Sequence, residues 1–318
     1  MVSDEQVERH LETVRGLSKV GRPLAPNAAT ATIDNPTWWI DGEPTPSRDR
    51  LHRRLLSQAR EARPGVKQQR RAIVLAGPPG AGKGWIRGKL LGADGDDFLV
   101  IDADDFKGAL LREALSDGSY DSWLMPDEVR ELGRNGHQFY PLELAALVHE
   151  ESSYLAKALR SDAIEAGDNI VIDAVLADSD KAVALGEQLA GAGYEVWVID
   201  VEVSRDVSEE RIRQRWRSAY LDACAGRDPL GGRWVPSEYA SEVFDGPAGL
   251  SRPAHAARRL ADECTAVRLY RMYNTEHAAD APVLTLVRVN AGGPLVELDE
   301  DADIATAVRS SPYWTGDR

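Results

Sequence analysis

A glycine-rich loop between a short apolar run and a helical pattern limits the folds open to this chain. The apolar run Ala72–Ala76 leads directly into the loop Gly77-Pro78-Pro79-Gly80-Ala81-Gly82-Lys83-Gly84. Such a strand, loop and helix form the Walker A unit, whose backbone N–H groups surround phosphates while its lysine reaches the β and γ oxygens. The loop therefore predicts an α/β fold with a nucleoside triphosphate site. The predicted nucleotide-binding residues are Gly77, Pro78, Pro79, Gly80, Ala81, Gly82, Lys83, Gly84 and Trp85.

One position of this loop departs from the usual pattern. Gly84 stands where a serine or threonine hydroxyl ordinarily contacts Mg²⁺, so that direct ligand is missing. The loops of adenylate-kinase-type proteins are similar in having Gly directly after the lysine, although Thr usually follows there and Trp85 follows here. We therefore expect ATP to bind together with Mg²⁺ that is held by phosphate oxygens and by waters on Asp102 or Asp104.

Beyond the loop, short apolar runs alternate with longer helical patterns, which is typical of a parallel sheet covered by helices. The expected strands are Ala72–Ala76, Phe98–Ile101, Asn169–Ile172, Glu195–Val201 and Val267–Tyr270. Helical patterns cover residues 84–92, 105–115, 143–166, 178–192, 206–224 and 251–263. Two further runs, Val283–Val289 and Leu295–Leu298, predict a terminal hairpin around Ala291-Gly292-Gly293. The pattern as a whole predicts a P-loop NTPase-type, doubly wound, mostly parallel sheet with helices on both faces.

The first 65 residues are expected to extend this domain rather than to form part of its sheet. Val7, Leu11 and Val14 have helical spacing within residues 4–19, and Ser47 is the expected N-cap of a second helix that ends before Pro64. We therefore predict an N-terminal helical extension and connector over residues 1–65, and a P-loop kinase domain over residues 66–318.

Composition and charge exclude several classes of protein. The 52 acidic and 38 basic residues give a net charge of −14, which argues against a nucleic-acid-binding surface. The apolar runs are far shorter than the roughly 20 residues that cross a bilayer, and the N-terminus lacks an apolar signal core. Cys224 and Cys264 lie too far apart in the sequence for a CxxC motif, which favours a reducing compartment. We therefore expect a cytoplasmic protein that binds neither nucleic acid nor membrane.

Three carboxylates follow the second expected strand, at Asp102, Asp104 and Asp105, and Lys107 comes shortly after them. In a doubly wound sheet the carboxyl ends of the strands face the ligand. A carboxylate there can take the proton of an attacking hydroxyl, and another can hold metal-bound water. The other role open to Asp104 or Asp105 is to cap the next helix.

The arginine and histidine side chains are further candidates for roles in the site. Arg211, Arg213, Arg215 and Arg217 crowd one helical stretch, where they flank an apolar stripe formed by Ile212, Trp216 and Tyr220. A planar guanidinium suits the charge of a phosphoryl transition state, so one or two arginines should meet the triphosphate. We select Arg215 and Arg233, with Arg227 as the chief rival. The six histidines lack metal-ligand spacing, and His149 is expected on the surface or in the core like the others.

The Walker A loop together with Asp102-Ala103-Asp104-Asp105-Phe106-Lys107 resembles the signature of the zeta toxin family, the UDP-N-acetylglucosamine kinases of bacterial toxin–antitoxin systems. The resemblance covers residues 66–275. It implies that Asp104 is the general base and that Asp173, which ends the run Asn169–Asp173, belongs to the substrate site. Arg215 before Trp216 and Arg233 before Trp234-Val235-Pro236 match two arginines of the family. An antitoxin protein is then a possible partner.

Two features depart from that family. Lys157 stands near the place of a substrate-binding glutamate, with Glu150 and Glu151 about two turns earlier. The His-Pro pair that commonly follows the Phe-Lys motif is absent as well. Both departures concern the substrate, so they leave the prediction of a kinase intact.

The sequence thus predicts an ATP-dependent kinase of a small-molecule hydroxyl, with UDP-N-acetylglucosamine as the implied acceptor. The alternatives are a kinase of a dinucleotide, nucleoside or antibiotic, and a nucleotide-binding regulator without turnover, which Gly84 favours. The expected catalytic residues are Asp104, Lys83, Arg215 and Arg233. The expected substrate-binding residues are Asp102, Asp104, Lys107 and Asp173, and the expected metal contacts, through water, are Asp102 and Asp104.

Overall fold

The structure is a computed structural model that describes residues 2–289 and 293–298. The chain groups into two compact units. Unit 1 comprises Met1–Ala62, Asp102–Ser161 and Glu209–Glu242, and unit 2 comprises Arg63–Ile101, Asp162–Ser208 and Val243–Arg318. The two units share the chain in alternating stretches. The predicted division at residue 65 into an extension and a kinase domain stays a prediction.

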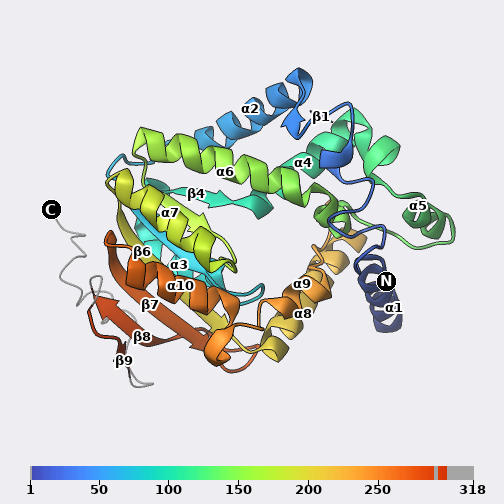
Figure 1. Cartoon of the computed structure of the whole chain (residues 1–318). Coiled ribbons are helices and arrows are strands. Elements are labelled where there is room, and N and C mark those ends of the chain that lie inside the picture. The colour runs from blue at the N-terminus through green and yellow to red at the C-terminus, as the bar shows by residue number, and fades with distance from the viewer. Residues whose placement is uncertain (1, 290–292, 299–318) are drawn as a thin grey trace. The chain divides into compact units, whose positions relative to one another are not determined.

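Unit 2 is built on a sheet whose described strands follow the order β4-β5-β3-β6-β7-β8-β9 (Figure 1). β3 pairs in parallel with β5 and β6, and β6 pairs in parallel with β7. β8 and β9 are added in antiparallel orientation. The predicted α/β fold with a mostly parallel, doubly wound sheet is confirmed. The strands are β3 (Arg71–Ala76), β4 (Leu99–Asp102), β5 (Ile170–Asp173), β6 (Glu195–Val203), β7 (Val267–Thr275), β8 (Val283–Val289) and β9 (Val296–Glu297).

Helices cover the sheet, and this cover is the reason why its strands are apolar. The residues of β3 from Ala72 to Ala76 are all buried, as in a parallel strand that is covered on both faces. α3 (Lys83–Leu91) packs Ile86 and Leu90 into the core cluster that includes β3 and β6 residues. α7 (Ser179–Gly191) packs against α10 (Arg252–Glu263), and α10 contacts β6 and β7.

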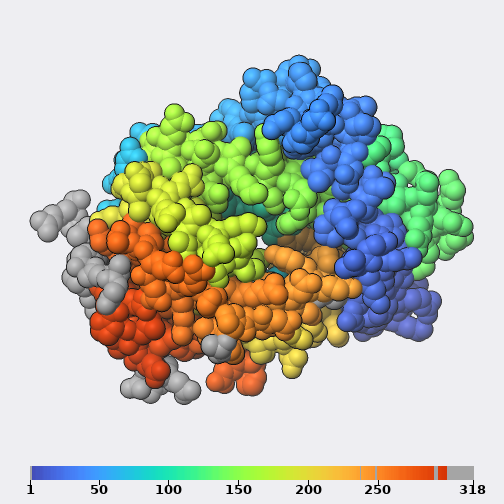
Figure 2. All heavy atoms as spheres, viewed as in Figure 1, coloured from blue at the N-terminus to red at the C-terminus, as the bar shows by residue number. Residues whose placement is uncertain are grey.

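A glycine allows α7 and α10 to approach closely. A Cβ on Gly186 of α7 would lie 2.5 Å from the Cδ1 atom of Leu260 and 2.9 Å from the Cβ atom of Cys264, both on the α10 side. In the space-filling view the yellow-green atoms of α7 adjoin the orange atoms of α10 (Figure 2). A larger side chain at position 186 would therefore force the two helices apart.

Several element boundaries differ from the prediction. β7 was expected to end at Tyr270 because Arg271 interrupts the apolar pattern, but it continues to Thr275 with Arg271 only 1% exposed. β8 and β9 form the two strands of the predicted hairpin, while residues 291 and 292 of its turn lie outside the described residues. None of the helices in the described ranges is long and apolar enough to cross a membrane.

Unit 1 is mainly helical and contains most of α8 (Arg205–Cys224). A short antiparallel pair, β1 (Trp39–Ile40) and β2 (Glu43–Pro44), lies in its N-terminal part. Unit 1 also contains most of α6 (His149–Ala166). The other elements are α1 (Asp4–Leu17), α2 (Pro46–Glu61), α4 (Ala103–Asp117), α5 (Asp127–Arg134) and α9 (Ser237–Glu242), with the 3₁₀ segments η1 (Thr32–Asp34) and η4 (Pro141–Val148) and the π-helical turn η3 (Tyr120–Leu124).

The predicted N-terminal helix is confirmed as α1, and it belongs to the core of unit 1. Ser3 and Gln6 form a capping box at its start. Val7 and Leu11 are buried in a cluster with Trp216 of α8. The apolar stripe that predicted the helix thus has a defined partner within the same unit.

A buried histidine and carboxylate add a polar contact to this packing. His10 Nε2 lies 3.0 Å from an Oε1 atom of Glu143, and both side chains are almost fully buried. Glu143 also accepts hydrogen bonds from Trp216 Nε1 at 3.1 Å and from the backbone N–H of Tyr140 at 2.9 Å. His10 therefore has the core role that the sequence predicted for the histidines.

Two predicted helix starts were wrong. Thr45 rather than Ser47 is the N-cap of α2, because Pro46 occupies the first helical turn, a position that proline favours. The helix expected from residue 143 begins as the 3₁₀ segment η4 and becomes α-helical only at His149. Helix α5 was not predicted from the sequence. Val129 is its one buried residue. A helix with so small a buried face leaves little periodic signal.

Candidate functional site

The phosphate-binding loop lies in unit 2 between β3 and α3, as predicted. Gly77, Gly80 and Gly82 have φ angles of +142°, +76° and +101°, which L-residues with side chains rarely adopt. A Cβ on Gly77 would also lie 2.2 Å from the backbone oxygen of Val201, so only glycine fits there. Gly82 is the N-cap of α3, and the helix N-terminus favours an anion next to the loop.

Two polar side chains brace this loop. Lys83 Nζ donates hydrogen bonds to the carbonyl oxygens of Gly77 at 2.8 Å and of Pro78 at 3.3 Å. The buried Ser208 Oγ donates to the carbonyl oxygen of Pro79 at 2.7 Å. Ser208 was not predicted to belong to the site, because a serine at the start of a helical pattern indicates an N-cap rather than a contact with a distant loop.

Asp173 ends β5, the strand beside β3, and its backbone is in register with Leu75. Arg87 of α3 donates a hydrogen bond from Nη1 to Asp173 Oδ2 at 3.1 Å. The structure therefore places Asp173 in the same unit as the loop, at the same edge of the sheet. Its predicted role in binding substrate stays a prediction.

A buried acidic pair on β6 was not foreseen. Asp200 Oδ2 accepts a hydrogen bond from the Tyr270 hydroxyl at 2.9 Å, and Glu202 Oε1 accepts one from Ser251 Oγ at 2.8 Å. Burial raises the pKa of both carboxyls. The charge of Asp200 raises the pKa of Glu202 further, and the charge of Lys83 lowers it in part. The signal in the sequence was two acidic residues at alternate positions of an otherwise apolar strand.

We expect this pair to make the protein less stable as the pH rises. A carboxyl with a raised pKa holds its proton in the folded chain and loses it in the unfolded chain, so the free energy of unfolding falls as the pH rises from about 4 through neutrality. Asp200→Asn removes one of the two groups and should flatten this fall. Urea unfolding of both proteins from about pH 5 to about pH 8.5 tests the expectation. Parallel profiles for the variant and the wild type would contradict it.

The predicted catalytic carboxylates lie in unit 1 at the start of α4. Asp102, not Asp104 or Asp105, caps the helix, because its carboxylate accepts a hydrogen bond from the backbone N–H of Asp104 at 2.8 Å. This corrects the sequence analysis, which considered only the later two residues for the cap. Asp102 stands in the extended conformation between β4 and α4, as an N-cap should.

Asp104 forms two ion pairs within unit 1. Lys107 Nζ lies 3.1 Å from Asp104 Oδ1, and Arg233 pairs with the same oxygen. Burial alone would raise the pKa of Asp104, but Lys107 and Arg233 together lower it well below the ordinary value. The carboxylate is therefore ionised at neutral pH and surrounded by cations. The structure brings Arg233, which the sequence selected from a different motif, to Asp104 and Lys107.

Arg215 of α8 belongs to the same cationic environment. Burial lowers its pKa to about 10, and Arg233 acts in the same direction, whereas Asp104 and Asp102 oppose the shift. The rival Arg227 instead pairs with Asp222 at an exposed position, with an Nε to Oδ1 distance of 2.9 Å. Lys107, Arg215 and Arg233 thus lie in one electrostatic environment with Asp104, and guanidinium and ammonium groups arranged in this way suit phosphate oxygens.

His149 is a further residue of this region that the sequence analysis did not assign to it. Burial lowers the pKa of its imidazole, and Lys107 and Arg233 act in the same direction against Glu150 and Asp104. The ring is therefore neutral at physiological pH and lies within the field of the cluster. No motif in the sequence pointed to it, because the contact joins α4, α6 and the segment after α8.

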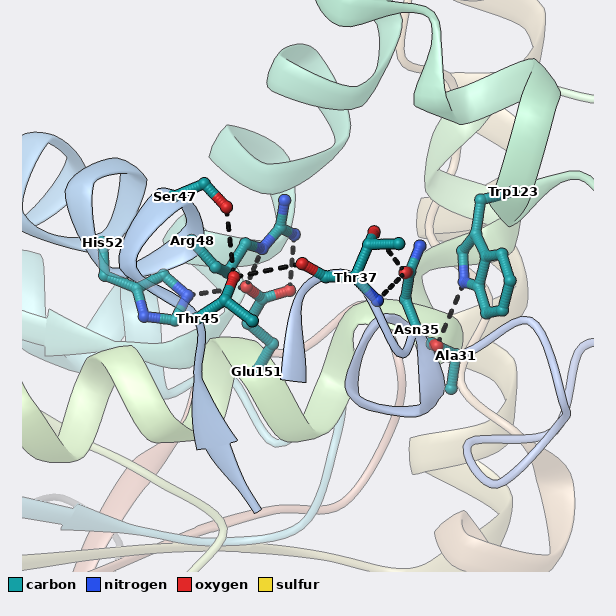
Figure 3. Close-up of polar contacts among 9 residues, drawn as sticks. All are labelled: Ala31, Asn35, Thr37, Thr45, Ser47, Arg48, His52, Trp123 and Glu151. Carbon is teal, nitrogen blue, oxygen red and sulfur yellow. Dashed lines mark hydrogen bonds and ion pairs between the residues drawn. The ribbon is translucent and has the colours of Figure 1, made fainter. Parts of the chain in front are cut away.

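Glu151 lies about two turns before the expected position of a substrate-binding glutamate, and its carboxylate is occupied by other contacts (Figure 3). Arg48 of α2 donates from Nε to Oε1 at 2.5 Å and from Nη2 to Oε2 at 2.7 Å. His52 Nε2 lies 2.6 Å from Oε1, and Glu151 is completely buried. The guanidinium of Arg48 also lies 4.0 Å from the ring centre of Trp38. Glu151 therefore holds α2 against α6 and is not exposed to a ligand.

No group of three or more His, Cys, Asp or Glu side chains within residues 2–289 and 293–298 is arranged to hold a metal ion. The predicted metal contacts, Asp102 and Asp104, are instead engaged with the helix N-terminus and with cations. A divalent cation near them would therefore need further ligands such as phosphate oxygens and water.

Comparison with known structures supports the fold. A crystal structure of the AvrRxo1-ORF1:AvrRxo1-ORF2 complex with sulphate ions has a TM-score of 0.55 and 20% identity, and the match covers 87% of this chain and 76% of that chain. A structure of the same complex with ATP gives a TM-score of 0.54 at 20% identity, with the same coverage. A chain of the PezAT chromosomal toxin–antitoxin system of Streptococcus pneumoniae has a TM-score of 0.45 and 17% identity, over 73% of this chain and 79% of that chain. At 20% identity, the two likenesses to the AvrRxo1-ORF1:AvrRxo1-ORF2 complex concern the fold alone.

Sequence comparison identifies the family. No curated protein matches this chain. The model of the zeta toxin family matches residues 110–279, which is more than half of the chain. The matched segment includes Asp173, Arg215 and Arg233, whereas the phosphate-binding loop and Asp104 precede it. On the extent of this match, the chain belongs to the zeta toxin family.

Proposed function

We propose that this protein is an ATP-dependent kinase that transfers the γ-phosphate to a hydroxyl of UDP-N-acetylglucosamine. The observation that carries the proposal is the loop Gly77–Gly84, with its left-handed glycines, its lysine and the following helix. Membership of the zeta toxin family supports a phosphotransferase, and a structure of similar fold was solved with ATP. A cytoplasmic location and an antitoxin partner form part of the same proposal.

Each of the predicted site residues would have its own role in the reaction. Lys83 would contact the β and γ oxygens, and Arg215 and Arg233 would stabilise the charge on the transferred group. Asp104 would accept the proton of the acceptor hydroxyl. A triphosphate that draws Arg233 away from Asp104 would raise the pKa of this carboxylate, so the base would strengthen when the nucleotide is in place. Asp102, Lys107 and Asp173 would position the acceptor.

We expect turnover to require Mg²⁺ although Gly84 offers no hydroxyl. Excess EDTA should lower the rate by about 100-fold or more, since the ion neutralises phosphate charge, and added Mg²⁺ should restore it. Gly84→Ser returns the usual hydroxyl ligand, and apart from the adjoining residues and the backbone of the helix no described atom lies within 4 Å of its Cβ position, so the side chain fits. The variant should reach half-maximal rate at a lower Mg²⁺ concentration. Full turnover in excess EDTA would contradict the requirement.

A kinase of a different small molecule is the second candidate, and the buried Glu151 favours it. This carboxylate is held by Arg48 and His52, so it does not serve as the substrate-binding glutamate of the family. Lys157, which stands near the expected place of that glutamate, carries the opposite charge and is exposed. A changed set of side chains at this point is consistent with an acceptor other than UDP-N-acetylglucosamine.

Measuring ADP release from the full chain with a panel of acceptors tests both candidates. The panel contains UDP-N-acetylglucosamine, a dinucleotide, nucleosides and aminoglycosides, each with ATP and Mg²⁺, and mass spectrometry identifies the phosphorylated product. Phosphorylation of UDP-N-acetylglucosamine supports the first candidate, and turnover confined to another acceptor supports the second. ATP binding without ADP release on any acceptor would support a regulator and reject both.

A further inference from the structure

Helix α3 presents an exposed face directly after the phosphate-binding loop. Gly84, Trp85, Gly88 and Lys89 share this face, because residues one turn apart are neighbours on a helix. All four are exposed, and 41% of the Trp85 surface is accessible. Among the described residues, nothing lies within 4 Å of the positions that a Cβ on Gly84 or Gly88 would take. The indole therefore stands beside a bare helix surface.

Trp85 takes no part in the core on which α3 rests. Ile86 and Leu90 provide that contact, and they point into the cluster with β3 and β6. A tryptophan buries a large apolar area when it is covered, but here much of that area remains exposed. Single exposed apolar residues are common, so it is the position of Trp85, rather than its exposure, that indicates a ligand contact.

The position of Trp85 must be compared with the direction in which a nucleotide would lie on the loop. The lysine of a Walker A loop reaches the β and γ oxygens, while backbone N–H groups hold the α and β phosphates. The nucleoside therefore leaves from the α-phosphate, at the end remote from the γ-phosphate. Trp85 follows Lys83 by two residues, on the first turn of α3, which is about 3 Å along the helix axis.

Lys89 places a positive charge over one face of the ring. Its Nζ atom lies 5.3 Å from the ring centre of Trp85, which is a cation–π distance. An aromatic ring suits a planar base, and a nearby ammonium suits the phosphates that the same ligand carries. The two glycines leave room for a planar group along the helix.

We propose that Trp85 is the stacking platform for the base of the bound triphosphate, with Gly84 and Gly88 giving room and Lys89 adding charge. The inference rests on the proposed function, since it requires a nucleotide on the loop. It assigns to Trp85 a contact with the base, which is separate from the phosphate contacts of Lys83.

Calorimetric titration of the full chain with two probes, ATP and inorganic tripolyphosphate, both with Mg²⁺, separates these contacts. Trp85→Ala should weaken ATP binding about 10-fold, because stacking of a base on an aromatic ring contributes roughly that much. Binding of tripolyphosphate, which has no base, should stay within about 2-fold of the wild type. Trp85→Phe keeps an aromatic face and should retain most of the ATP affinity. Lys83→Ala, the matched control, should weaken both probes.

The outcomes distinguish the inference from the proposed function. If Trp85→Ala binds both probes as the wild type does, no stacking occurs and the inference fails. If it weakens both probes equally, the residue acts on the shape of the loop, and the inference fails again. If the wild type binds neither probe, or Lys83→Ala binds both normally, the proposed nucleotide site itself is rejected.

Discussion

Asp104→Asn is expected to lower turnover by about 10²- to 10⁴-fold while ATP binding does not weaken. The substitution keeps the shape of the side chain but removes the proton acceptor and one negative charge between Lys107 and Arg233. Those cations then lose the carboxylate that pairs with both of them, so their attraction for phosphate oxygens should persist or increase. Steady-state kinetics on the true acceptor and ATP titration measure the two effects.

Lys83→Ala is the matched comparison for this variant. It removes a direct phosphate contact, so both ATP affinity and turnover should fall, whereas Asp104→Asn affects turnover alone. Thermal unfolding of both variants must show that each is folded. If Asp104→Asn turns over at nearly the wild-type rate, another group accepts the proton, and Asp105, Asp173 and the neutral His149 are the next to test.

Glu151→Ala is expected to destabilise the protein by about 3 to 5 kcal/mol, because it leaves the guanidinium of Arg48 buried without its carboxylate. Arg48 and His52 are both almost fully buried, so water does not replace the lost contacts. The contacts of Arg48 and His52 lower the pKa of Glu151 against the effect of burial, so they stabilise the protein at neutral pH and lose this effect in acid. Denaturant unfolding at about pH 7 measures the loss.

An exposed ion pair on α2, the helix that carries Arg48, provides the control. Arg53 pairs with Asp49 at 2.7 Å, but 68% of the Arg53 side chain is exposed. Arg53→Ala should therefore cost less than about 1 kcal/mol, since water replaces the lost partner. Equal losses for Glu151→Ala and Arg53→Ala would show that the buried contact has no special weight.

The sequence by itself determined the phosphate-binding loop and those elements that have a clear apolar pattern. Ala72–Ala76 had to form a buried strand because its residues are apolar without interruption, and the loop needed glycine at Gly77, Gly80 and Gly82 for left-handed backbone angles. α1 followed from the spacing of its apolar residues. These features depend on near neighbours along the chain, and near neighbours are what a sequence displays directly.

Only the tertiary structure decided the partners of the charged residues. The sequence predicted Asp104 or Asp105 as the helix cap, whereas the backbone geometry at the end of β4 makes Asp102 the cap. Arg233 meets Asp104 across more than a hundred residues, and Glu151 meets Arg48 at a similar separation. Burial then set the protonation of Asp200, which its position in the sequence leaves open. Attraction between charges and the cost of burying them depend on distances in space, and spacing along the chain does not fix those distances.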